Sequence, residues 1–312
     1  MVAIFFCFFL FASGIFANKL ILATLSPSML SGIRMLISGI ILLILNRKSF
    51  RNGVFGRALE HWKMFVSIAL FTHFIPTLCK AYAVKNMSTA KAGFLGSLDP
   101  FVTALYVYII FSESLTFKKW VGIIIGFSGA LFLTTLSSPL EATLQTFMVF
   151  SLPEIAALAS VMVSRLGWIL VQKKLRSDSF SPTQVNGITM TLGGIFSFLS
   201  IPIWQMLGST ESFNIISKLD IRLGLLLFFT IVFGNLGAYN LYAYLLKHNS
   251  STLMSIAGFT VPIHLALLGF FILGEPIPAV LIKAGIIMFI GMAIFYYDDV
   301  MRGLAVKQEI KP

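Results

Sequence analysis

Residues 81–113 decide the fold, because their pattern returns once later in the chain. They read AYAVKNMSTAKAGFLGSLDPFVTALYVYIIFSE, and residues 243–275 read AYLLKHNSSTLMSIAGFTVPIHLALLGFFILGE. The matching positions share one offset of 162 residues (81 to 243, 100 to 262, 113 to 275), and in both stretches a glutamate follows the proline after 13 residues. Chance similarity between apolar helices explains a repeated Ala-Tyr pair, but it is a poor explanation for a proline and a glutamate at one offset. We therefore interpret the two stretches as an internal duplication.

Two further matches extend the duplication toward the N-terminus. Ser26-Pro27 returns as Ser181-Pro182 and Lys19-Leu20 returns as Lys174-Leu175, both at an offset of 155 residues. The pattern predicts a first five-helix repeat over 1–140, a second over 149–300 and a cytoplasmic tail over 301–312. Five crossings per half give the halves opposite orientations, an inverted arrangement that allows opening to either side of a membrane in turn.

The composition places these helices in lipid. Of the 312 residues, 57% are hydrophobic and 11% are charged, whereas a soluble domain is about 45–50% apolar and about 25% charged. Soluble, disordered and fibrous classes are thereby excluded, and the apolar runs are continuous, which excludes an alternating outer-membrane barrel. We predict an all-α integral membrane protein with ten transmembrane helices, at about 2–17, 27–46, 64–84, 88–111, 118–137, 149–171, 182–207, 223–246, 250–273 and 279–297.

The basic residues predict the orientation. With the N-terminus inside, 14 lysines and arginines fall in inside segments and 4 in outside segments. Such a bias is typical of cytoplasmic loops, so the net charge of +11 reflects topology and not nucleic-acid binding. We expect a multi-pass protein of the cytoplasmic (inner) membrane with both termini in the cytoplasm.

Several local motifs, taken in order, resemble one known family. They are Ser26-Pro27 through Arg34, Ala81-Tyr82, Pro100, Glu113-Ser114-Leu115, Trp120-Val121-Gly122, Gly126 and Gly129, then Tyr244, Pro262, Gly274-Glu275-Pro276 and Gly291. The sequence is similar to the ten-helix EamA-type drug/metabolite transporters over nearly its whole length. This resemblance implies a secondary transporter with a central cavity. One departure is that Thr189 stands in the second half where Arg34 stands in the first.

Charged side chains inside apolar spans are the first candidates for the site, because burying a charge in lipid costs roughly 2.5–3.5 kcal/mol. Asp99 precedes Pro100, which interrupts the helical hydrogen bonds, and a carboxylate beside a broken helix suits a cation or proton site. Its structural alternative is a capping aspartate paired with Lys91 or Arg34. Arg165 lies too far along its helix from Glu154 to pair with it, and we expect Lys80 to extend toward the headgroups.

The predicted site residues fall into three groups. For substrate binding we predict Asp99, Arg34, Lys91, Arg165, His264, Trp168, Tyr82 and Tyr244. For helix breaks and gating we predict Pro27, Pro100, Pro182 and Pro262. As structural caps of loops at the membrane edge we predict Glu113 and Glu275. Helix packing or interfacial anchoring is the alternative for most of the aromatic residues.

No motif for catalysis or cofactor binding is found. The sequence has no GxxxxGK[ST], HExxH or GxSxG, and its two cysteines support neither a disulfide scaffold nor a zinc site. We predict no enzyme activity, no catalytic residues, no metal and no cofactor.

The mixture of acid, base and aromatic residues suits a small zwitterionic or cationic metabolite. Members of the resembled family carry amino acids, drugs and, in some host-dependent bacteria, S-adenosylmethionine, and we expect this or a related adenosyl compound, by uptake or exchange. The alternatives are an exporter of amino acids or toxic compounds, and a non-transporting structural or regulatory membrane protein. The expected partners are the substrate, the bilayer and a coupling proton or exchange substrate, without nucleic acid. Direction, coupling and oligomeric state stay open at this stage.

Overall fold

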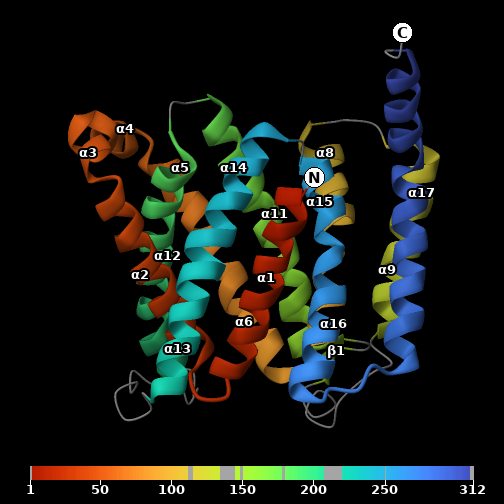
Figure 1. Cartoon of the computed structure of the whole chain (residues 1–312), viewed down its shortest axis with the longest axis horizontal. Coiled ribbons are helices and arrows are strands. Elements are labelled where there is room, and N and C mark those ends of the chain that lie inside the picture. Colours follow the sequence, from red (N-terminus) through yellow and green to blue (C-terminus); the bar gives the residue numbers. More distant parts are fainter. Residues whose placement is uncertain are drawn as a thin grey trace.

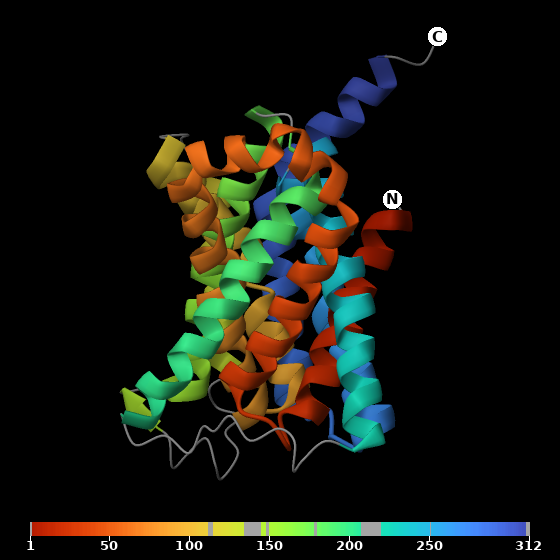
Figure 2. The same ribbon diagram turned by 90° about the vertical axis from the view of Figure 1, so that its left-hand side faces the viewer.

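A computed structural model describes residues 2–111, 115–133, 145–147, 150–177, 180–206, 220–249 and 251–309. It is a bundle of helices that run side by side along one direction, and both chain termini lie at the same end of the bundle (Figure 1 and Figure 2). A chain that crosses a membrane an even number of times has both termini on the same side.

The first half contains these described elements: α1 (Val2–Ile21), α2 (Pro27–Leu45), α3 (Arg47–Ser49), η1 (Phe50–Val54), α4 (Phe55–Glu60), α5 (Trp62–Ile68), η2 (Ala69–Phe74), α6 (Ile75–Asn86), α7 (Thr89–Gly96), α8 (Asp99–Phe111) and α9 (Phe117–Leu133). The second half contains α11 (Leu152–Ser177), α12 (Pro182–Met206), α13 (Ile221–Phe229), η4 (Thr230–Tyr239), α14 (Asn240–His248), α15 (Ser251–Gly258), α16 (Thr260–Leu273) and α17 (Ala279–Glu309). A two-stranded hairpin of β1 (Gln145–Phe147) and β2 (Phe150–Ser151), which the sequence did not predict, lies between them.

The prediction of an all-α membrane protein is confirmed. Seven helices among the described residues are long and apolar enough to cross a membrane. The predicted spans 88–111 and 250–273 are divided into α7 with α8 and α15 with α16, and α9 has 17 residues. The count of ten membrane crossings therefore stays a prediction. The predicted tail over 301–312 does not begin as a segment separate from the last helix, because α17 continues without a break to Glu309.

Capping and proline explain where several helices begin. The Ser26 hydroxyl accepts a hydrogen bond from the Met29 backbone N–H, and Pro27 occupies the first turn of α2, a position where its missing N–H has no consequence. Pro182 likewise begins α12. Pro100 and Pro262 instead lie in the first turns of α8 and α16, directly after the interruptions that separate these helices from α7 and α15.

The packing of the helices relates the two halves to each other. The second helix of each half pairs with its counterpart (α2 with α12), and the last helices do the same (α9 with α17). In addition α1 packs on η4 and α16, while α11 packs on α6 and α7. Figure 1 shows α9 and α17 side by side at one edge of the bundle. This reciprocal pattern supports the proposed duplication.

Candidate functional site

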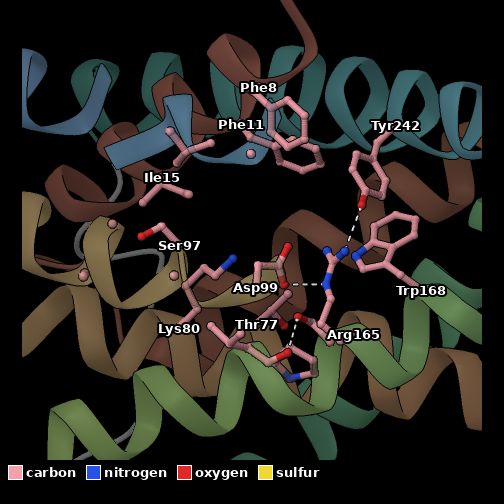
Figure 3. Close-up of a pocket in the computed structure, with 18 of the residues that line it drawn as sticks. Phe8, Phe11, Ile15, Thr77, Lys80, Ser97, Asp99, Arg165, Trp168 and Tyr242 are labelled. Carbon is pink, nitrogen blue, oxygen red and sulfur yellow. Dashed lines mark hydrogen bonds and ion pairs between the residues drawn. The ribbon is translucent and has the colours of Figure 1, made fainter. Parts of the chain in front are cut away.

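A cavity of about 140 Å³ lies inside the bundle, between elements of both halves. Helices α1, α6 and α8 from the first half, and α11, η4 and α16 from the second, contribute to its wall. In Figure 3, Lys80 and Ser97 lie at one end, Trp168 and Tyr242 lie at the other, and Asp99 and Arg165 lie between them. The cavity therefore has a polar end, an ion pair in the middle and an aromatic end.

The ion pair joins the two halves. Arg165 Nε on α11 lies 2.5 Å from Asp99 Oδ1, and the two side chains are 9% and 20% exposed. The Nε–H group of Arg165 makes no hydrogen bond to Asp99, so the contact between them is an ion pair. Arg165 Nη1 also donates to the hydroxyl of Tyr242 at 3.2 Å. Because α8 begins at Asp99, the break before Pro100 brings the carboxylate to the cavity wall.

Aromatic rings form the opposite end of the cavity. The Trp168 and Tyr242 rings meet edge to face with centroids 4.5 Å apart, and Phe8 approaches Tyr242 at 5.9 Å. Phe11 and Tyr239 meet at 5.2 Å. All five residues line the cavity. Such a wall can accept a flat ring or a cationic group.

A smaller cavity of about 50 Å³ shares Lys80, Thr77 and Tyr239 with the first. The buried Arg34 lines it, and its Nη2 donates to Asn235 Oδ1 at 2.5 Å while Asn235 Nδ2 donates to the Arg34 carbonyl at 3.0 Å. Arg34 Nε has no hydrogen-bond partner among the described residues. Arg34 has no basic counterpart in the second half of the sequence, and its hydrogen-bond partner is an asparagine of that half.

Four of the predicted substrate-binding residues do not line either cavity: Lys91, His264, Tyr82 and Tyr244. Lys91 Nζ instead lies 2.7 Å from Glu154 Oε1, with both side chains almost fully buried. Tyr244 is 54% exposed. It follows Tyr242 by two residues, which is about 200° around a helix, so the two rings point to opposite sides. His264 packs edge to face against Phe9, with centroids 5.6 Å apart.

Of the two predicted loop caps, only Glu275 lies in the described part of the chain. Its Oε2 accepts hydrogen bonds from the Thr89 backbone N–H at 3.1 Å and the Thr89 hydroxyl at 2.8 Å. It thus ties the loop after α16 to the first turn of α7. Glu113 lies outside the described residues.

Lys80 is the charged residue of the larger cavity that the sequence reasoning did not assign to the site, and the cavity residues Phe8, Phe11, Tyr239 and Tyr242 were not assigned to it either. Lys80 lines both cavities and is exposed, although α6 lies within the bundle. Its position a turn and a half from the end of α6 suggested extension toward the headgroups, and nothing in the sequence indicates which face of α6 meets the cavity. In the described ranges no cluster of three metal-ligating side chains is found.

Comparisons with known proteins agree with this architecture. The sequence model described as the EamA-like transporter family matches residues 1–135 and 151–297. An S-adenosylmethionine/S-adenosylhomocysteine transporter of Chlamydia muridarum is 26% identical over 305 residues, covering 96% of this chain and 92% of that protein. A protein of the same description from Chlamydia trachomatis serovar L2 is 26% identical over 96% of this chain and 90% of its own. A solved crystal structure superposes with a TM-score of 0.61 at 17% identity, over 94% of each chain, which concerns the fold alone.

Proposed function

The chain belongs to the EamA-like transporter family, and on that premise we propose that it carries S-adenosylmethionine or S-adenosylhomocysteine across the cytoplasmic membrane by alternating access. Membership of this family makes the chain a transporter and not an enzyme. The substrate is the proposed part. It is supported by the names of the chlamydial relatives and by the chemistry of the cavity.

The observation that carries the substrate proposal is the division of the cavity into two chemically different ends. An adenosyl amino acid has an adenine ring at one end and an α-ammonium and a carboxylate at the other. The Trp168 and Tyr242 rings provide a surface on which a base can stack. Asp99 provides an anion for the ammonium, since its contact with Arg165 is made through Oδ1 and Figure 3 shows its other oxygen pointing away from Arg165. The sulfonium of S-adenosylmethionine would lie between these ends, near the faces of the aromatic rings.

Alternating access is supported by the position of the site between the halves. Asp99 and Lys80 come from the first half, whereas Arg165 and Trp168 come from the second. Movement of one half against the other would therefore change the site itself. We propose two inverted five-helix repeats, over 1–140 and 149–300, with both termini in the cytoplasm. A coupling proton or an exchanged substrate would supply the driving force.

Counterflow in proteoliposomes tests the substrate. Vesicles loaded with unlabelled S-adenosylmethionine should accumulate labelled S-adenosylmethionine, and external S-adenosylhomocysteine should compete. Methionine, adenosine and a panel of other amino acids serve as comparisons. If labelled amino acids accumulate and adenosyl compounds neither accumulate nor compete, the substrate proposal is wrong and an amino-acid exporter becomes the better reading.

A further inference from the structure

The charged residues that line the larger cavity do not balance one another. They are Lys80, Asp99 and Arg165. Arg165 is already paired with Asp99 at 2.5 Å, so their charges compensate each other. Lys80 is left as an uncompensated cation. The smaller cavity adds Arg34, whose partner Asn235 is neutral, and contributes no carboxylate among the described residues.

The Lys80 ammonium makes no hydrogen bond and no ion-pair contact to any residue in the described part of the chain. The two fully buried lysines in the described part of the chain do have a contact of this kind or a ring against them: Lys91 has Glu154, and Lys174 lies over the Phe180 ring at 4.8 Å. Figure 3 shows the Lys80 side chain reaching into the cavity on the side of Asp99, without a dashed line to it. Lys80 therefore presents a cation without a counter-charge to a cavity inside the bundle, where an anion that enters can pair with it.

We propose that Lys80 binds the carboxylate of the transported molecule and so selects substrates that carry an α-carboxylate. This inference rests on the proposed function for the position of the substrate. The ammonium and the carboxylate of an α-amino acid are held on one carbon atom, so their binding partners must lie close together. Lys80 and Asp99 meet this condition, since both line the larger cavity and Figure 3 shows the Lys80 side chain extending from its end of the cavity toward Asp99.

Lys80 also lines the smaller cavity, where Arg34 has an unpartnered buried nitrogen. One flexible side chain can therefore reach an anion from either cavity. Arg165 is held through Nε by Asp99 and through Nη1 by Tyr242, so it has less freedom to follow an anion than Lys80 has. The flexible ammonium, whose charge no carboxylate compensates, is thus better placed than the guanidinium to bind a substrate carboxylate.

The test compares two substrates that differ only in the carboxylate. Binding of S-adenosylmethionine and of decarboxylated S-adenosylmethionine is measured on the purified protein for the wild type, Lys80→Met and Lys80→Arg. We expect Lys80→Met to weaken binding of the carboxylated compound by about tenfold to a hundredfold, the range for loss of a hydrogen bond to a charged group. Binding of the decarboxylated compound should change less than about twofold, and Lys80→Arg should retain most of the preference.

Two controls separate this role from a structural one. Lys85→Met removes the same charge from an exposed position of the same helix that lines neither cavity, and it should leave both affinities unchanged. The unfolding temperature of substrate-free Lys80→Met should equal or exceed that of the wild type, because an unpaired cation is removed. A lower unfolding temperature would mean that Lys80 stabilises the fold.

The outcomes distinguish the two proposals. If wild-type protein binds neither adenosyl compound, the proposed substrate is wrong. The same three variants are then measured with the best amino acid of the counterflow panel and its matching amine, which keeps the assignment of Lys80 testable. If the wild type binds both adenosyl compounds and Lys80→Met weakens them equally, the substrate proposal survives and the carboxylate role of Lys80 is wrong.

Discussion

Arg165 of the second half holds Asp99 of the first half at 2.5 Å, in the middle of the cavity that the two halves enclose. The pair is at once a link between the halves and a part of the binding surface that we propose. Its two functions can be separated, because a buried pair behaves differently when one partner is removed and when both are removed.

Asp99→Asn should reduce both stability and transport. The substitution leaves the Arg165 guanidinium without a counter-charge, at a cost of about 3 kcal/mol, the lower end of the range for a broken buried pair because Asp99 keeps 20% of its surface exposed. The double variant Asp99→Asn/Arg165→Gln should recover most of the stability but not the transport. Thermal unfolding and counterflow measure the two effects. Full transport by the double variant would remove Asp99 from the substrate site.

The pair formed by Lys91 and Glu154 should matter for stability alone. Both side chains are buried, the two charged atoms are 2.7 Å apart, and neither residue lines either of the two cavities described above. Glu154→Gln should lower the free energy of unfolding by about 3–5 kcal/mol. Lys91→Met/Glu154→Gln, which keeps an acceptor for the Ser151 backbone N–H and hydroxyl, should restore most of it and bind substrate within about twofold of the wild type. Strongly weakened binding in this stable double variant would show that the sequence-based assignment of Lys91 to the site was right.

Trp168→Ala should weaken binding of adenosyl compounds by about tenfold, as expected for the loss of one aromatic ring that stacks on a base. Trp168→Phe should retain part of the affinity. Binding of the ring-free methionine, where measurable, should change little. The matched control is Trp204→Ala on α12, since Trp204 is 43% exposed and lines neither cavity. Equal losses for adenosyl compounds and methionine would argue against an aromatic end that recognises the base.

Gly291→Ala should destabilise the contact between α9 and α17. An added Cβ would lie 2.6 Å from the backbone nitrogen of Gly126 and 2.8 Å from the carbonyl oxygen of Gly122. Overpacking of this kind costs about 1–3 kcal/mol, and thermal unfolding measures it. The control, Gly224→Ala in α13, meets no atom within 4 Å and should stabilise the helix by up to about 1 kcal/mol. A Gly291→Ala variant as stable as the wild type would contradict the close approach of these helices.

The sequence by itself determined the class of the protein and the helix boundaries near Pro27, Pro100, Pro182 and Pro262. These features are local. Apolar length, capping and the missing N–H of proline act within one helix or its ends, so they can be read along the chain.

Only the tertiary structure decided which charged residues meet. The candidate partners for Asp99 were Lys91 and Arg34, yet Asp99 pairs with Arg165, and Lys91 pairs with Glu154. Helical spacing predicts which residues share a face but not which face another helix covers. Lys80 was missed for the same reason: its charge is left unpaired by the way α6, α8 and α11 enclose a cavity, and that enclosure depends on packing between halves that are distant in the chain.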